Sequence, residues 1–175
     1  MKRRRLLALF FLPLALAGWL AAGSTRAQQG LPFKADLVLV FKAERRLELR
    51  RGGRALRSYR ISLGGSPVGH KVQEGDERTP EGLYLLDWRN PDSRFYKSIH
   101  VSYPSEQDRE RALSLGVDPG GMIMIHGFPN WYRPGIADWV FTRRDWTRGC
   151  IAVRNDEMEE IWQAVDDGTP IMIFR

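Results

Sequence analysis

The sequence contains a single cysteine, Cys150, and only three histidines among its 175 residues. One cysteine cannot form a disulfide within the chain, so the fold does not depend on internal disulfide bonds. No two of Cys150, His70, His100 and His126 lie within a few residues of each other, as the ligands of most zinc sites do. We therefore expect no metal site and no other cofactor, and Cys150 is the first residue to consider.

Several common catalytic motifs are also missing. The sequence has no Ser-x-x-Lys or Gly-x-Ser-x-Gly motif, which mark serine acyl-enzymes, and no His-Glu-x-x-His motif of zinc peptidases. Gly-x-Gly-x-x-Gly and the phosphate-binding loop motif, which bind nucleotides, are absent as well. Serine acyl-enzyme chemistry and nucleotide chemistry thus lack their usual sequence support.

The first 27 residues contain no acidic residue. Residues 1–5 are basic, residues 6–22 are apolar apart from Pro13 and Gly18, and the small residues Thr25 and Ala27 precede Gln28. This order predicts a secretory signal peptide over residues 1–27, cleaved before Gln28, and export by the general secretory route to the periplasm or cell wall. An uncleaved anchor helix is the alternative, although an apolar run of about 17 residues is at the short limit for crossing a bilayer.

The formal net charge of +6 is mostly a property of this leader, which carries five of the 27 basic residues. The rest of the chain is nearly neutral, so we expect no nucleic-acid partner and, after cleavage, no stable insertion into a membrane. A local excess of positive charge remains close to Cys150, because residues 141–154 contain four arginines and one acidic residue, Asp145. This excess is either a solvated surface or a site for an anionic substrate.

Residues 28–175 have the patterns of one β-rich domain with mixed α/β structure. Alternating or continuous apolar runs predict strands at 35–41, 45–50, 56–63, 82–88, 99–103, 122–126, 151–153 and 171–174. Gly52 and Gly53 predict a hairpin turn between the second and third of these strands. Helices are predicted over 105–115, capped by Ser105, and from a cap at Asn155 to about residue 165. Residues 128–146 are irregular and aromatic, and form either a lid or a layer packed on the core.

Cys150 and His126 are the best candidates for a catalytic pair. Cys150 follows Gly149, which allows close backbone approach, and Arg148 favours the thiolate that attacks carbonyl groups. Alternatively, this cysteine is a small apolar side chain buried in the core. His126, at the end of a predicted strand, is placed to act as the base, and the backbone carbonyl of Gly127 could hold its tautomer. For this histidine, a core position satisfied by backbone groups is the alternative.

The motifs around these residues resemble those of a known family. Ile125-His126-Gly127, followed some twenty residues later by Thr147-Arg148-Gly149-Cys150-Ile151, is similar to the active-site signature of the YkuD-type L,D-transpeptidases. The stretch 75–82 and the pairs Tyr103-Pro104 and Gly120-Gly121 add to the likeness, which covers roughly residues 35–175. Arg148 replaces the usual histidine, and Ala152 stands where many members have arginine or asparagine, as in a divergent branch.

This resemblance implies a β-sandwich or barrel with a few short helices, and acyl transfer on peptidoglycan stem peptides. Cys150 would form a thioester, His126 would move the protons, and the N–H groups of Gly149 and Cys150 would stabilise the oxyanion. We expect Arg148, Arg154 and Trp146 to bind the substrate, and the domain to be a monomer. The acceptor is a second stem in a transpeptidase, or water in an L,D-carboxypeptidase or amidase. Two competing functions are a non-catalytic wall-binding module and an unrelated exported cysteine peptidase.

Overall fold

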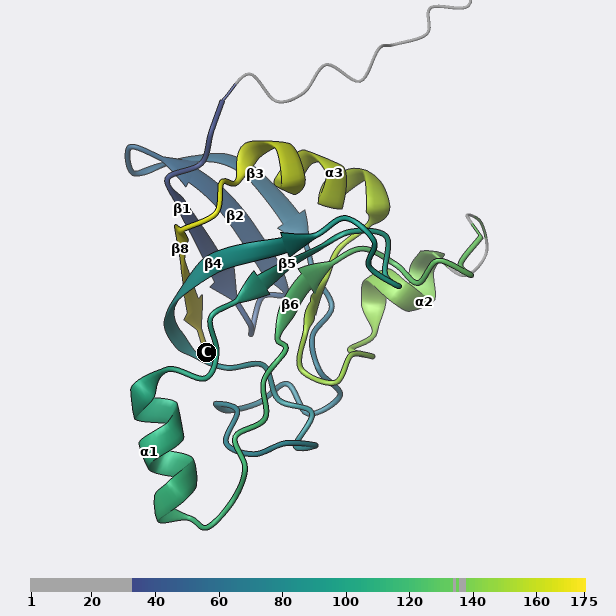
Figure 1. Cartoon of the computed structure of the whole chain (residues 1–175). Coiled ribbons are helices and arrows are strands. Elements are labelled where there is room, and N and C mark those ends of the chain that lie inside the picture. Colours follow the sequence, from purple (N-terminus) through teal and green to yellow (C-terminus); the bar gives the residue numbers. More distant parts are fainter. Residues whose placement is uncertain (1–32, 134, 136–137) are drawn as a thin grey trace, which may run out of the picture.

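Eight strands form one curled, mixed sheet (Figure 1). The computed structural model describes residues 33–133, 135 and 138–175, so the predicted signal peptide and the first residues of the predicted domain lie outside the described residues. The strands pair in the order β3-β2-β1-β8-β4-β5-β6-β7. Their bounds are β1 (Leu37–Phe41), β2 (Arg46–Arg51), β3 (Arg54–Arg60), β4 (Gly82–Asn90), β5 (Ser98–Val101), β6 (Met124–His126), β7 (Ile151–Ala152) and β8 (Thr169–Phe174).

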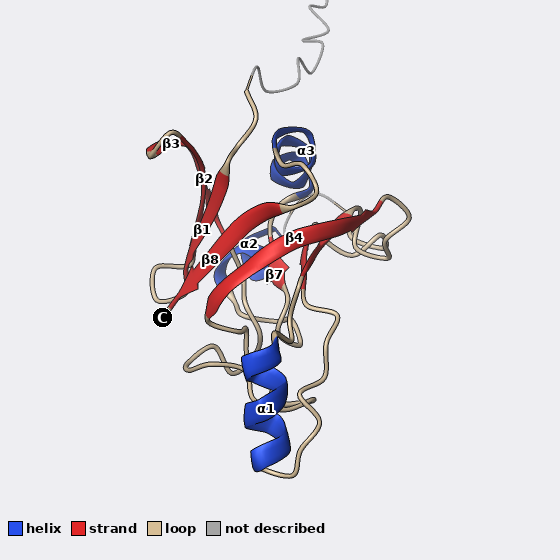
Figure 2. Cartoon of the chain, turned by 60° about the vertical axis from the view of Figure 1, so that its left-hand side comes forward, coloured by secondary structure: helices blue, strands red, loops and turns tan. Residues whose placement is uncertain are grey.

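The described helices are α1 (Glu106–Ser114), α2 (Asp138–Arg143) and α3 (Asn155–Ala164). Short helices beside a large sheet confirm the predicted fold class, mixed α/β and mainly β. Figure 2 shows α1 and α3 at opposite ends of the molecule. Among the described residues, no helix combines the length and the apolar character that crossing a membrane requires.

Alternate residues of the central strands build the core. Val38 and Val40 in β1 are fully buried, and Leu47 and Leu49 repeat this alternation in β2. Successive side chains of a strand point to opposite faces, so this period of two sends one set of side chains to one side of the sheet. α3 adds its own apolar residues to the same core: Met158, Ile161 and Ala164.

The two ends of the sheet meet beyond β3. Ser62 and Ala152 exchange two backbone hydrogen bonds, of 2.9 and 2.8 Å, and Gly64 forms a bridge with Thr147. A side chain at Gly64 would overlap the carbonyl oxygen of Glu77, so glycine is required for the backbones to approach this closely. Through this closure, the loop that joins β3 to β4 packs against the turn before β7.

The first predicted helix is confirmed, with its cap. The hydroxyl of Ser105 accepts a hydrogen bond from the backbone of Asp108, and the Asp108 carboxylate accepts one from the backbone N–H of Ser105 at 2.9 Å. These reciprocal bonds satisfy backbone donors that the first turn of a helix leaves free.

Two expectations about helices are wrong. Residues 128–146 are not wholly irregular, because they contain the six-residue helix α2. Phe141 of this helix packs against other aromatic rings of the same segment. The cap of α3 is Arg154 rather than Asn155, and the N–H of Arg154 donates to the side chain of Glu157 at 3.0 Å. The Asn155 side chain instead accepts a hydrogen bond from the backbone of Phe128 at 2.7 Å, a tertiary contact that no local pattern encodes.

Candidate active site

The turn before β7 presents Cys150. The hydroxyl of Thr147 accepts a hydrogen bond from the N–H of Gly149 at 3.1 Å and donates one to the carbonyl of Cys150 at 2.7 Å. Gly149 has a φ of +120°, and a Cβ there would lie 2.6 Å from the carbonyl oxygen of Arg78. Any other residue would be strained and would clash, so Gly149 is required to place the cysteine.

The Cys150 thiol is held in its protonated form. Its Sγ lies 3.6 Å from the carbonyl oxygen of Met122, which accepts the thiol hydrogen bond. Met122 has a φ of +57°, a conformation that costs energy for a residue with a side chain. Burial raises the pKa of the Cys150 thiol, and a backbone hydrogen bond from Met124 and the charge of Lys71 offset this only in part. Attack by Cys150 on a carbonyl therefore requires a base.

Cys150 lies in the wall of a pocket of about 450 Å³. Three segments of the chain contribute its lining: the loop before β4, the segment before β6 and the turn before β7. The charged residues of this lining are of both signs: Lys71, Arg148, Glu74 and Glu77. Backbone from Gly120 to Ile123 forms another part of the wall. The pocket can thus receive a polar, charged ligand next to the thiol.

His126 has an apolar environment. It is only 4% exposed, and its ring lies 4.6 Å from Phe95 and 5.7 Å from Trp146, measured between centroids. Burial lowers the pKa of His126 to about 4, although a hydrogen bond to the Gly127 carbonyl acts in the opposite direction. Nδ1 of His126 lies 2.6 Å from that carbonyl oxygen, so Nδ1 carries the hydrogen and Nε2 is free to accept a proton. Near neutral pH His126 is thus an uncharged base.

The register of β6 and β7 puts Cys150 and His126 on the same side of the sheet. His126 is paired with Ala152, and Cys150 directly precedes β7, two residues before Ala152. When the alternation of the strand is continued by this one residue, both side chains face away from the core residues Ile125 and Ile151. The hydrogen bonds of the described residues do not join the two side chains directly. The thiol is instead bonded to the Met122 carbonyl, and catalytic hydrogen bonds often tighten only when substrate binds.

The turn after His126 is fixed by its neighbours. The N–H of Gly127 donates to the carbonyl of Phe95 at 3.0 Å, and a Cβ on Gly127 would lie 2.5 Å from the Asn155 side-chain oxygen. The same Asn155 oxygen accepts the N–H of Phe128 at 2.7 Å, so it holds the chain directly after the carbonyl that orients His126. Asn155 is therefore a structural support of the histidine, a role that its sequence context does not indicate.

The predicted oxyanion donors differ in availability. The N–H of Gly149 is already bonded to the Thr147 hydroxyl at 3.1 Å. The N–H of Cys150 has no acceptor among the hydrogen bonds of the described residues. The structure thus favours Cys150, and not Gly149, as the backbone donor to a developing oxyanion.

The predicted substrate-binding residues do not gather at one place. Arg148 lines the pocket, whereas Arg154 lies at the start of α3 and donates to Asp156 at 3.0 Å. Trp146 packs on His126, and its indole N–H donates to the carbonyl of Phe141 at 3.1 Å. Of the three, Arg148 alone is among the residues that line the described pocket, and Trp146 contributes to the enclosure of the base.

Lys71 is a pocket residue that the sequence motifs do not reveal. It is 3% exposed, and its charge lowers the pKa of Cys150, a role that the sequence pattern assigns to Arg148. Lys71 lies far from Cys150 in the sequence, and no motif spacing links the two. A signal was nevertheless present, because Lys71 closely precedes the stretch 75–82 that resembles the family loop.

The other two histidines lie outside the pocket lining. His70 contacts Asp108 of α1, and His100 contacts Asp87 and stacks on Trp88. Among the residues that the structure describes, no three His, Cys, Asp or Glu side chains come close enough together to hold a metal ion.

Comparisons with known proteins agree with this geometry. The protein named "Putative L,D-transpeptidase YafK" from Escherichia coli K12 is 32% identical over 174 residues, covering 91% of this chain and 62% of its own length. The structure of the helical cell shape determining protein Pgp2 from Campylobacter jejuni is 30% identical, with a TM-score of 0.59, covering 78% of this chain and 46% of its own. This chain therefore spans about half to two thirds of the length of these relatives.

More distant structures share the fold alone. The L,D-transpeptidase from Xylanimonas cellulosilytica is 16% identical, with a TM-score of 0.51 over 81% of this chain and 61% of its own. Residues 35–173 match the family described as the L,D-transpeptidase catalytic domain, YkuD, which confirms the resemblance found in the sequence. That match spans nearly all of the described residues, including Cys150 and His126, and the chain belongs to the YkuD family of L,D-transpeptidase catalytic domains.

Proposed function

We propose that this chain is a cysteine-dependent acyltransferase that acts on peptidoglycan stem peptides in the periplasm or cell wall. The main support is the position of the Cys150 thiol in a pocket lined by charged residues. His126 lies on the same side of the sheet, is neutral, and has its Nδ1 bonded to a backbone carbonyl. The family supports a peptidoglycan substrate, and Pgp2 is named for determining helical cell shape.

The first half-reaction forms a thioester. Nε2 of His126 takes the proton of Cys150 while Sγ attacks the carbonyl carbon of the third residue of a donor tetrapeptide. The N–H of Cys150 donates to the oxygen of the tetrahedral intermediate, a contact typically worth about 2.7–4 kcal/mol. The bond to the terminal D-alanine then breaks, and its nitrogen leaves with the proton from His126.

The second half-reaction depends on the acceptor. An amine of a second stem attacks the thioester, gives its proton to His126, and the thiol is restored when the C–S bond breaks. The result is a 3→3 cross-link. Water at the same step gives a tripeptide, which is the L,D-carboxypeptidase reaction. An amidase that releases an anchored protein uses the same thioester chemistry with a different leaving group.

The test combines a covalent adduct with a product profile. Purified protein incubated with donor tetrapeptide should gain the mass of the acyl group, and Cys150→Ala should abolish the adduct. Muropeptides digested with and without the protein should then show new 3→3 dimers, new tripeptides or released protein, each of which names one acceptor. An adduct that persists in Cys150→Ala, or an unchanged muropeptide profile with active wild-type protein, would contradict the proposal.

Two further expectations accompany the proposal. Export by the general secretory route follows from residues 1–27 and is tested by N-terminal sequencing of the protein from the periplasm.

We also propose that the domain acts as a monomer. A wall-binding module without turnover would bind peptidoglycan equally well with Cys150 or with alanine at that position.

A further inference from the structure

Lys71 is an ammonium group buried in the wall of the nucleophile pocket. It is 3% exposed, and it donates to the carbonyl of Gln73 at 2.8 Å and to the carboxylate of Asp76 at 2.9 Å. The third N–H of this ammonium has no acceptor among the hydrogen bonds of the described residues. Its Nζ also lies 6.0 Å from the centre of the Tyr103 ring. Buried charges are costly even when they are paired, so a lysine buried in the wall of the pocket that contains the thiol needs an explanation.

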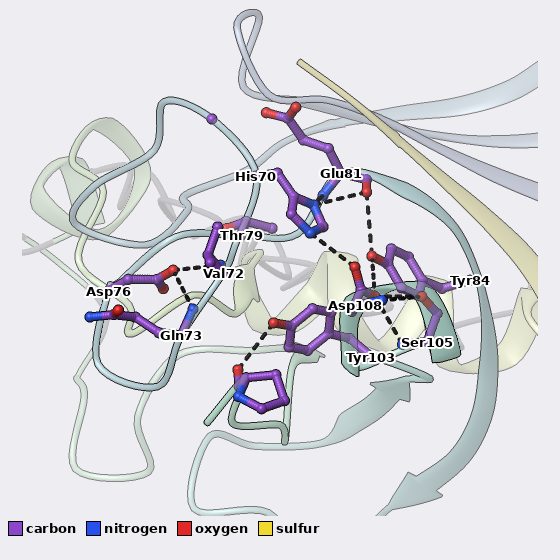
Figure 3. Close-up of polar contacts among 12 residues, drawn as sticks. His70, Val72, Gln73, Asp76, Thr79, Glu81, Tyr84, Tyr103, Ser105 and Asp108 are labelled. Carbon is purple, nitrogen blue, oxygen red and sulfur yellow. Dashed lines mark hydrogen bonds and ion pairs between the residues drawn. The ribbon is translucent and has the colours of Figure 1, made fainter. Parts of the chain in front are cut away.

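Asp76 is the charged partner that fixes the Lys71 ammonium. The Asp76 carboxylate also accepts backbone hydrogen bonds from Val72 and Gln73, at 2.8 and 3.1 Å (Figure 3). A third backbone N–H, from Arg78, donates to it at 3.0 Å. Burial alone would raise the pKa of Asp76, but these bonds and the one from Lys71 lower it, so the carboxylate stays charged. Three backbone N–H groups thus help to keep Asp76 charged, and with it the ion pair that holds the Lys71 ammonium in place.

The loop that carries Lys71 is anchored on both sides. His70, the preceding residue, accepts the N–H of Glu81 on Nδ1 at 3.0 Å, and its Nε2 lies 2.9 Å from the carboxylate of Asp108 (Figure 3). Tyr84 donates to that same carboxylate at 2.9 Å. On the other side of the loop, the carbonyl of Arg78 touches Gly149 next to the nucleophile. The position of Lys71 relative to Cys150 is thus set by the fold and not by a mobile side chain.

Lys71 differs from the other charged groups that line the pocket. Arg148, Glu74 and Glu77 are exposed, so water and salt screen their charges. His126, the proposed base, is neutral. Lys71 is buried, where the effective dielectric constant is lower and a charge acts more strongly on its neighbours.

We propose that Lys71 is a positioning residue for the nucleophile: its ammonium, fixed by Asp76 and the Gln73 carbonyl, stabilises the negative charge that forms on Sγ when Cys150 loses its proton. The lowering of the Cys150 pKa by Lys71 agrees with this geometry. The inference rests on the proposed function and deepens it, because it names a side chain that favours the deprotonated form of the nucleophile.

The test measures the thiol itself. The rate of Cys150 alkylation by iodoacetamide is followed by mass spectrometry from pH 6 to pH 10, on the purified full chain. Lys71→Met keeps the length of the side chain and removes the charge; its alkylation midpoint should rise by about one pH unit, making the reaction about tenfold slower at neutral pH. Lys71→Arg should restore a midpoint close to that of the wild type.

Two further variants separate charge from packing. Asp76→Asn removes the opposing charge while retaining an oxygen acceptor, so its midpoint should move downward, opposite to that of Lys71→Met. Lys42→Met removes another buried lysine that anchors the same loop, through Gly69, Thr79 and Glu81, but does not line the pocket. Lys42→Met should lower the melting temperature and leave the midpoint unchanged.

The proposal is overturned if folded Lys71→Met keeps the wild-type midpoint, or if Asp76→Asn shifts it in the same direction as Lys71→Met. Should Lys71→Met fail to fold, the direction in which Asp76→Asn moves the midpoint decides: a downward shift supports the proposal, and no shift or an upward shift contradicts it. Alkylation needs no peptidoglycan, so this result is independent of the substrate. An unchanged muropeptide profile would contradict the proposed reaction. It would not affect the proposal about Lys71, which the alkylation midpoints test separately.

Discussion

The two sides of the nucleophile differ in kind. On one side, Cys150 faces a pocket whose wall includes charged groups, among them the buried Lys71. On the other side, His126 is enclosed by Phe95 and Trp146. The charged side can stabilise a thiolate and bind an ionic substrate, whereas the aromatic side keeps the base uncharged. Stabilisation of the thiolate and removal of the thiol proton are thus assigned to two groups in different environments.

The largest expected effect comes from removing the base on the aromatic side. His126→Ala should lower the rate of acyl-enzyme formation by about 10²–10⁴-fold, because general base catalysis typically contributes that much. Stopped-time mass spectrometry with donor peptide measures the rate, and thermal melting checks the fold. His100→Ala, which changes a histidine bound to Asp87 outside the pocket lining, is the matched control. Normal acylation in His126→Ala would show that another group accepts the proton.

A smaller effect should appear in stability against pH. The folded pKa of His126, about 4, lies below its ordinary value of 6.5, so the unfolded chain binds the proton more readily. The free energy of unfolding is therefore not reduced by His126 above about pH 6.5. It decreases as the pH falls toward 4, by up to about 3 kcal/mol. Denaturant unfolding of wild type and His126→Gln between pH 4 and pH 7 measures this. Parallel stability curves for the two proteins would show that the histidine is not buried in its neutral form.

The smallest effects compare two arginines. Arg148→Gln should raise KM for an anionic stem peptide several-fold at low salt and less at high salt, since Arg148 is exposed in the pocket. Arg154→Gln should leave KM unchanged and cost only a few tenths of a kcal/mol of stability, because its ion pair with Asp156 is at the surface. Steady-state kinetics at two salt concentrations gives both answers. Equal effects of the two variants would restore the sequence-based expectation that both arginines bind substrate.

Much of the fold follows from local patterns. Period-two alternation around Val38, Val40 and Leu47 predicts strands with one buried face, and paired glycines predict the turn between β2 and β3. The helix α2 has no clear sequence signal because it is short and rich in aromatic residues, so its existence depends on contacts around Phe141. Asn155 resembles a helix cap in the sequence because a good capping residue is also a good hydrogen-bond acceptor for a distant backbone group.

The candidate site was predictable only where its residues are close in sequence. Thr147 to Cys150 and His126 with Gly127 are visible as motifs, and the His126 Nδ1 contact with the Gly127 carbonyl agrees with the expected geometry. Lys71 belongs to a different loop, and its place beside the thiol depends on the closure of the sheet. The occupied N–H of Gly149 could not be foreseen either, since it depends on the orientation of one hydroxyl.

The strand that follows the nucleophile has only two residues, yet it is bonded on both sides. β6 pairs with one edge of β7, and Ser62 pairs with the other through Ala152. These contacts join parts of the chain that are far apart in sequence, so the surroundings of Cys150 depend on the closure of the whole sheet. Hydrogen exchange would show it directly, because the amide of Ala152 should become protected together with the core and not before it.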